Sequence, residues 1–256
     1  LFRGEPWPDD VKKDAVDFVT RNGKAFEKIP ELLRRKEGWS KIAYANGFNA
    51  LLPHLADFKR FAQALEKKAG LDAEEKRPHE AVRAIQAAFA TAHALDREPT
   101  LISQLVRIAV DSIACGAIDR VLNRVEVDEA DLLALQQIAA ARGDLKTLNV
   151  GLAGEFCFGS DAFSRGPGYL VGLGGLSGNG GSGSNPGASA ALWLYSASGL
   201  LRQDGACYVE MLSDFIQLAR RDPWERLEAT DAWEQRVVTL KSEWYKGHIL
   251  TSMLLP

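Results

Sequence analysis

Residues 99–122 read PTLISQLVRIAVDSIACGAIDRVL and decide the fold of this chain. The proline at their start is typical of the first turn of a helix, and apolar residues follow on nearly every side of that helix. Only Arg107 and Asp111 interrupt the apolar surface near the middle of the segment. A helix of this kind belongs in a core. We therefore expect a central apolar helix over about residues 100–123, surrounded by other helices.

The rest of the chain also shows helical periodicity. Apolar residues recur every three or four positions over residues 48–69 and 78–96, and charged residues stand between them. Strand signals are confined to residues 125–127 and 169–171. We predict an all-α fold, an irregular bundle of about eight to ten helices that forms a single domain over residues 1–256.

Residues 166–187 differ in composition from their surroundings. They hold ten of the 23 glycines of the chain, with prolines at 167 and 186. Glycine at that density disfavours a helix, so we expect a flexible glycine-rich insertion at the surface. Residues 178–183 match the dinucleotide pattern G-x-G-x-x-G, but no strand is expected before them. We attribute the match to composition and expect no cofactor.

Charge and residue spacing argue against several function classes. The chain has 31 basic and 34 acidic residues, a net charge of −3, and no basic stripe, so no nucleic-acid partner is expected. Its three cysteines are far apart and indicate neither a disulfide framework nor a zinc motif. The four histidines are scattered without metal-ligand spacing, so no metal is expected. No serine-hydrolase motif is found either.

Charged residues in apolar surroundings are the first candidate site. Arg107 and Asp111 are four residues apart, so they share one face of the expected central helix and can pair. Glu155 stands in the apolar segment 152–158, either as a second partner of Arg107 or as a general acid with a raised pKa. One interpretation is a structural ion pair or network, and the other is an acid–base or anion-binding cleft.

Two aromatic residues after the glycine-rich segment are the second candidate. Trp193 and Tyr195 pack in the core on one interpretation. On the other, they form an aromatic surface that contacts a partner.

Several segments together carry a family resemblance. They are DREPTLISQLVRIA at 96–109, GEF and DAF at 154–156 and 161–163, and YVEM and PWERL at 208–211 and 223–227. In this order they resemble a group of bacterial proteins with an N-terminal membrane anchor, a helical extracytoplasmic domain and no assigned activity. The glycine-rich insertion departs from that group.

The resemblance implies that an anchor preceded Leu1 and that more sequence follows Pro256. It also implies a place on the extracytoplasmic side of the cell envelope. Within the chain, no run approaches the roughly 20 apolar residues that span a bilayer, so a membrane is expected only through the missing segment. Because the group has no assigned activity, the resemblance implies no catalytic residues.

The leading functional hypothesis is a non-catalytic interaction or scaffold domain of the cell envelope, which presents a groove to a protein or peptide partner. The alternative is a hydrolase-like or small-ligand-binding enzyme that uses a polar cleft at Arg107, Asp111 and Glu155. An open cavity with unpaired carboxylates would favour the enzyme, whereas closed pairing in a core would favour the interaction domain.

Overall fold

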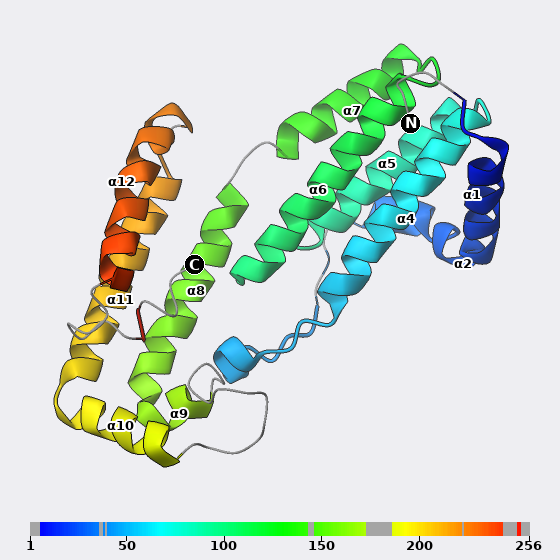
Figure 1. Cartoon of the computed structure of the whole chain (residues 1–256). Coiled ribbons are helices and arrows are strands. Elements are labelled where there is room, and N and C mark those ends of the chain that lie inside the picture. Colours follow the sequence, from blue (N-terminus) through cyan, green and yellow to red (C-terminus); the bar gives the residue numbers. More distant parts are fainter. Residues whose placement is uncertain are drawn as a thin grey trace. The chain divides into compact units, whose positions relative to one another are not determined.

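A computed structural model describes residues 6–35, 38, 40–142, 146–172, 186–221, 223–242 and 250–251 of the chain (Figure 1). The described residues are mostly helical and include no strand, so the predicted all-α fold is confirmed. The helices are α1 (Asp9–Arg21), α2 (Gly23–Phe26), α3 (Ile29–Arg34), η1 (Tyr44–Asn49), α4 (His54–Glu74), α5 (Pro78–His93), α6 (Leu101–Leu122), α7 (Glu129–Arg142), α8 (Lys146–Arg165), α9 (Pro167–Gly172), α10 (Pro186–Ala197), α11 (Leu200–Ala219) and α12 (Pro223–Ser242).

Proline defines where many of these helices begin. The helices α5, α9, α10 and α12 all start at a proline. Proline suits this position because its ring fixes φ near the helical value and because the first N–H groups of a helix have no partner within it. The described residues also include three short helices, α2, α3 and α9, which are only four to six residues long.

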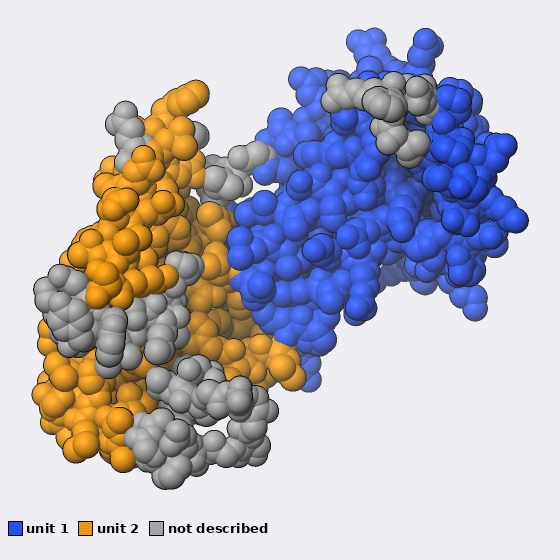
Figure 2. Space-filling view, in the orientation of Figure 1, with its two compact units in different colours: residues 1–41, 52–98, 102–147 blue, residues 42–51, 99–101, 148–256 orange. Residues whose placement is uncertain are grey.

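The chain forms two compact units (Figure 2). The first comprises Leu1–Lys41, Leu52–Glu98 and Ile102–Thr147, and the second comprises Ile42–Leu51, Pro99–Leu101 and Leu148–Pro256. Each unit has its own hydrophobic clusters. The single domain expected from the sequence stays a prediction.

The core of the first unit lies where α4 and α5 pack along each other, with α3 and α7 also against α5. Buried side chains from α4, such as Leu65, meet Val82, Ile85 and Phe89 of α5. The buried face of α5 also carries small side chains, which let neighbouring helices approach closely. These are Ala81, Ala84, Ala87, Ala88 and Ala92.

The helix α6 is buried along one face only. Val110, Ala114 and Val121 are fully buried in the first unit. Ile102 and Leu105 are each 51% exposed. Part of the apolar surface of α6 is therefore exposed in the structure. Periodicity predicted the helix, but an apolar surface does not specify which of its faces will be covered by neighbouring helices.

By length and composition, α6 is also the one helix in the described part of the chain that could cross a membrane, although no run of the sequence was expected to approach that length. The core helix of a protein can have the same length and composition. Arg107 and Asp111 lie within this helix and form ion pairs in the first unit. Such pairs are costly at the centre of a bilayer, which favours α6 as a packed helix of its unit.

In the second unit, one hydrophobic cluster joins α8, α9, α10 and α11 with Leu250, and another joins α11 and α12. Tyr208, Met211 and Leu212 of α11 are buried beside Val237 of α12. Asp204 of α11 is fully buried and accepts hydrogen bonds from the backbone N–H groups of Leu250 and Thr251, at 2.8 and 3.0 Å. Both carboxylate oxygens of Asp204 therefore have hydrogen-bond partners, as a buried polar group requires.

The prediction of a non-helical insertion over residues 166–187 is wrong at both of its ends. Residues 167–172 form α9, and α10 begins at Pro186. In each case a proline starts the helix, and proline's preference for the first turn outweighs the glycines that follow it. The remainder of the predicted insertion, residues 173–185, lies outside the described residues.

Two glycines on α8 allow close approach by other parts of the second unit. A methyl group on Gly154 would overlap the backbone carbonyl of Pro99, and one on Gly159 would overlap the ring of Tyr208. The contact at Gly154 is the stricter of the two, because a backbone carbonyl cannot rotate away as the end of a side chain can. The backbones of α8 and of residues 99–101 can pack this closely only with glycine at 154.

We expect Gly154→Ala to destabilise the protein by about 1–3 kcal/mol, through overpacking against Pro99. The measurement is the free energy of unfolding in urea. The matched control is Gly168→Ala in α9, where an added methyl group meets nothing within 4 Å and the change is expected to be neutral or slightly stabilising. Equal stability of the two variants would contradict the close packing of α8.

Candidate functional site

A continuous chain of polar contacts runs along the buried face of α6 in the first unit. We call it the α6 polar network. It links α6 to the start of α4, to the end of α5 with the connection that follows it, and to the end of α7. Its members are His54, His93, Asp96, Glu98, Ser103, Gln104, Arg107, Asp111 and Arg142.

Arg107 and Gln104 form the middle of the network. The Arg107 side chain is only 2% exposed, and its Nε donates to Oε1 of Gln104 at 2.9 Å while Nη1 donates to Asp111 at 3.0 Å. The Gln104 amide in turn donates to the backbone carbonyls of Leu95 and Glu98, both at 2.9 Å. Burial lowers the pKa of Arg107, and Asp111 opposes that change. The middle of the network is thus a closed set of partners.

Arg142 closes one end of the network. Its guanidinium makes a bidentate contact with Asp96, at 2.8 Å for both bonds, and donates two more hydrogen bonds to Asp111 at 3.0 and 3.1 Å. Burial disfavours the charge on Arg142, but the hydrogen bonds to Asp96 and Asp111 outweigh it and raise its pKa. Burial also raises the pKa of Asp111, and the two guanidinium groups oppose that rise.

The other end of the network is a histidine, a carboxylate and a hydroxyl. His54 Nε2 lies 2.9 and 3.1 Å from the two carboxylate oxygens of Glu98, and the Ser103 hydroxyl donates to Glu98 at 2.6 Å. In a nucleophilic triad the imidazole lies between the hydroxyl and the carboxylate, so that it can take the proton of the hydroxyl. Here the carboxylate lies between the other two. This order differs from that of a triad and fits a structural contact.

A groove adjoins the network in the first unit. It has a volume of about 580 Å³ and lies between α3, α5 and α7. Its floor is apolar, and one wall is formed by His93, Asp96 and Arg142, with His93 Nδ1 2.6 Å from the Asp96 carboxylate. We call it the α3–α5–α7 groove, and its lining residues are Leu33, Gln86, Phe89, Ala90, His93, Asp96, Ile138, Ala141 and Arg142.

The residues predicted from the sequence are only partly brought together. Arg107 and Asp111 pair as expected. Glu155 belongs to the second unit, where its carboxylate accepts a hydrogen bond from the backbone N–H of Leu101 at 3.1 Å. Burial raises the pKa of Glu155, and this one hydrogen bond opposes the rise. Arg107 and Glu155 therefore have different partners, each within its own unit.

The two aromatic candidates differ from each other. Trp193 is 61% exposed on α10, next to the exposed Leu194. Tyr195 is half-buried against the cluster of α9, α10 and α11, and its hydroxyl donates to Asp204 at 3.1 Å. Core packing therefore describes Tyr195, while Trp193 is available for a surface contact.

Sequence reasoning missed several members of the network and the whole groove. Asp96, Glu98 and Arg142 are charged residues near helix ends, where such residues are common and carry no motif. The groove draws its lining from three helices that are far apart in the chain. The apolar periodicity of α3, α5 and α7 indicated that they pack, but not where a hollow would remain between them.

A separate group of metal-ligating side chains lies outside the network. The ligand atoms of His79, Asp128 and Asp131 are within 4.8 Å of one another at the surface of the first unit. The sequence gave no indication of this group, because 49 or more residues separate the histidine from the two aspartates.

Comparison of the chain with protein-family models, with curated proteins and with solved structures gives no match. The resemblance to membrane-anchored bacterial proteins therefore stays a prediction. The function has to be inferred from the geometry of the site.

Arg142→Met leaves Asp96 and Asp111 without their shared cation. Each carboxylate then keeps one other partner, Arg107 for Asp111 and His93 for Asp96, but loses two charged hydrogen bonds, so we expect a loss of about 3 kcal/mol in the free energy of unfolding. Arg107→Met is expected to cost less, since Asp111 keeps both hydrogen bonds from Arg142. Urea unfolding of the two variants tests this order. An Arg142→Met variant as stable as the parent would show that neither carboxylate depends on that cation.

The Glu155→Gln variant tests whether burial of the Glu155 carboxylate in the second unit lowers the stability of the fold. The folded state disfavours the ionised form of Glu155, so its pKa lies above the value of about 4.5 that it has in the unfolded chain. We expect the glutamine variant to be more stable than the parent at pH 7. This advantage shrinks as the pH falls through the raised pKa and disappears below the unfolded value.

The measurement is the free energy of unfolding between about pH 4 and 7.5. Glu234→Gln on α12 removes the same charge from an exposed site and serves as the control. A Glu155→Gln variant that is less stable than the parent at pH 7 would contradict the predicted cost of ionising Glu155.

Proposed function

We propose that this protein is a non-catalytic interaction domain of the cell envelope, which binds a peptide segment of a protein partner in the α3–α5–α7 groove. The observation that carries the proposal is a groove with an apolar floor beside a wall of charges that are already held in place. The floor would take an apolar side chain of the partner, and the wall would set the direction of its chain.

The size and lining of the groove support this function. A volume of about 580 Å³ lies within the range of pockets that enclose small ligands or the anchor residues of a peptide. Leu33, Phe89 and Ile138 supply apolar surface from three different helices. Anchor residues in such pockets contribute most of the binding free energy of an interface, and charged groups at the edge select the partner.

The pairing of the α6 polar network also favours binding over catalysis. Asp96 and Arg142 line the groove, and both are engaged with other members of the network. A general acid or base needs a proton that it can give to or take from a substrate. Arg107 is almost fully buried, and Glu155 has its own partner in the second unit. The enzyme alternative required these groups to converge on an open cavity.

The proposed location rests on the sequence alone. The segments at 96–109, 154–163 and 208–227 resemble extracytoplasmic domains of anchored bacterial proteins. The lack of a basic excess agrees with a protein or peptide partner rather than nucleic acid.

A groove-filling variant tests the function. Ala141 lines the groove on α7, so Ala141→Trp would occupy space that the partner needs. Peptides are first selected from a random displayed library for binding to the parent protein. We expect the selected peptides to bind Ala141→Trp at least about tenfold more weakly, which corresponds to about 1.4 kcal/mol of binding free energy.

The matched control is Leu133→Trp, which adds the same ring at an exposed position of α7 that does not line the groove. It should bind the peptides like the parent, and unfolding curves of both variants should show that they fold. The proposal fails if the selection yields no binders, or if the selected peptides bind Ala141→Trp and the parent equally.

A further inference from the structure

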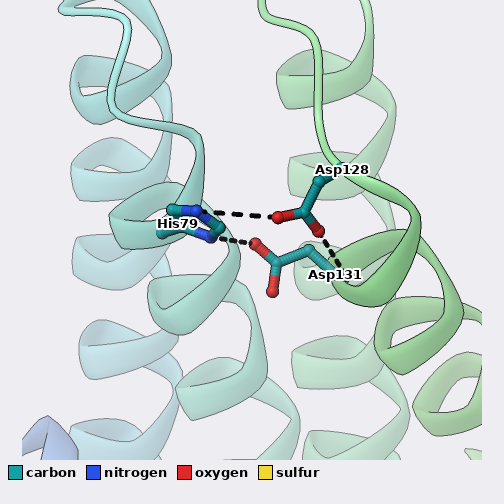
Figure 3. Close-up of side chains that lie close together, drawn as sticks. All are labelled: His79, Asp128 and Asp131. Carbon is teal, nitrogen blue, oxygen red and sulfur yellow. Dashed lines mark hydrogen bonds and ion pairs between the residues drawn. The ribbon is translucent and has the colours of Figure 1, made fainter.

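A histidine and two aspartates meet between the first turns of α5 and α7 (Figure 3). His79 is the second residue of α5, Asp128 directly precedes α7, and Asp131 lies in the first turn of α7. His79 Nδ1 is 2.6 Å from Oδ2 of Asp131, and His79 Nε2 is 3.6 Å from Oδ2 of Asp128. The imidazole thus faces one carboxylate on each of its two nitrogen atoms.

Local structure orients His79 and Asp128 although both side chains are exposed. Pro78 starts α5 immediately before His79. Asp128 caps α7: its Oδ1 accepts a hydrogen bond from the backbone N–H of Asp131 at 2.8 Å, which leaves Oδ2 directed towards His79. The cap therefore orients one carboxylate oxygen towards the imidazole.

We propose that His79, Asp128 and Asp131 form a binding site for a divalent transition-metal ion, with Zn²⁺ as the best match. The ligands are one imidazole nitrogen and one oxygen from each aspartate. This mixed set of nitrogen and oxygen suits Zn²⁺, whereas Mg²⁺ and Ca²⁺ prefer sites made of oxygen alone. Two carboxylates and a neutral imidazole carry a charge of −2, which balances the charge of the ion.

The spacing of the ligand atoms supports the site. Zinc bonds of about 2.0–2.2 Å in tetrahedral geometry place neighbouring ligand atoms roughly 3.4 Å apart. A single ion binds only one nitrogen of an imidazole ring. With one ligand atom taken from each of the three residues, the atoms lie within 4.8 Å of one another. The side chains of His79, Asp128 and Asp131 are 66%, 51% and 23% exposed, so they can rotate towards a shared ion without disturbing the core.

A bound ion would compete with a proton for the imidazole of His79. Carboxylates on both sides of the ring raise the pKa of His79 above its ordinary value, with Asp131 as the main cause. Metal binding requires the neutral imidazole, so it releases a proton and grows stronger as the pH rises. The three protein ligands leave a tetrahedral ion with a position for water, as in an open zinc site.

The site would join two helices that line the α3–α5–α7 groove. His79 lies on α5 and the aspartates lie at the start of α7, so a bound ion would link their first turns. An ion that binds the folded chain and not the unfolded one raises the stability of the fold. The proposed metal site does not depend on whether the groove binds a peptide.

The experiment uses the full chain after treatment with EDTA. Zn²⁺ is titrated in by calorimetry at pH 7.5, and the melting temperature is measured with Zn²⁺ and with EDTA. We expect one saturable site and a higher melting temperature with Zn²⁺. His79→Gln and Asp128→Asn should each weaken binding at least about tenfold. Asparagine is as good a helix cap as aspartate, so Asp128→Asn removes the ligand charge and keeps α7 capped.

Asp57→Asn is the control, because it removes an exposed carboxylate from the first turn of α4, outside the group. It should bind Zn²⁺ like the parent. The proposal is overturned if the parent binds no Zn²⁺. It is also overturned if His79→Gln and Asp128→Asn bind as tightly as the parent, since the ligands would then be other groups such as the cysteine thiols.

Discussion

The guanidinium of Arg142 lies between Asp96 and Asp111 and donates two hydrogen bonds to each of them. Only arginine presents enough donors in one plane to satisfy two carboxylates in this way. The contact joins the end of α7 to α6 and to the connection between α5 and α6. The position of these elements in the first unit, and with it the charged wall of the groove, depends on this one cation.

Because Arg142 and Arg107 hold Asp96 and Asp111, these charges link the helices of the first unit to one another. A carboxylate held by two arginines is a poor base, and Ser103 donates to the Glu98 carboxylate and not to an imidazole as in a triad. The same pairing gives the groove a rigid polar edge, which is what selective binding needs. The proposed binding function rests on these fixed charges and on the apolar floor of the groove.

Much of the fold could be predicted from the sequence, because helices depend on local spacing. The periodicity at 78–96 and 99–122 predicted α5 and α6, and the pairing of Arg107 with Asp111 followed from their spacing. The exposed face of α6 could not be predicted. The burial of a residue depends on which other helices pack against it. The sequence around an apolar residue such as Leu105 does not show whether its side chain will be covered.

The sequence by itself determined that this chain is helical, where most of its helices lie, and which charged residues share a face of α6. Only the tertiary structure decided that Arg142 would complete the network, that a groove would remain between three helices, and that His79 would meet Asp128 and Asp131. The physical reason is the distance along the chain over which each kind of interaction acts. Helical periodicity and caps act over three or four residues, whereas each of these sites joins side chains dozens of positions apart, and their meeting depends on how whole helices pack.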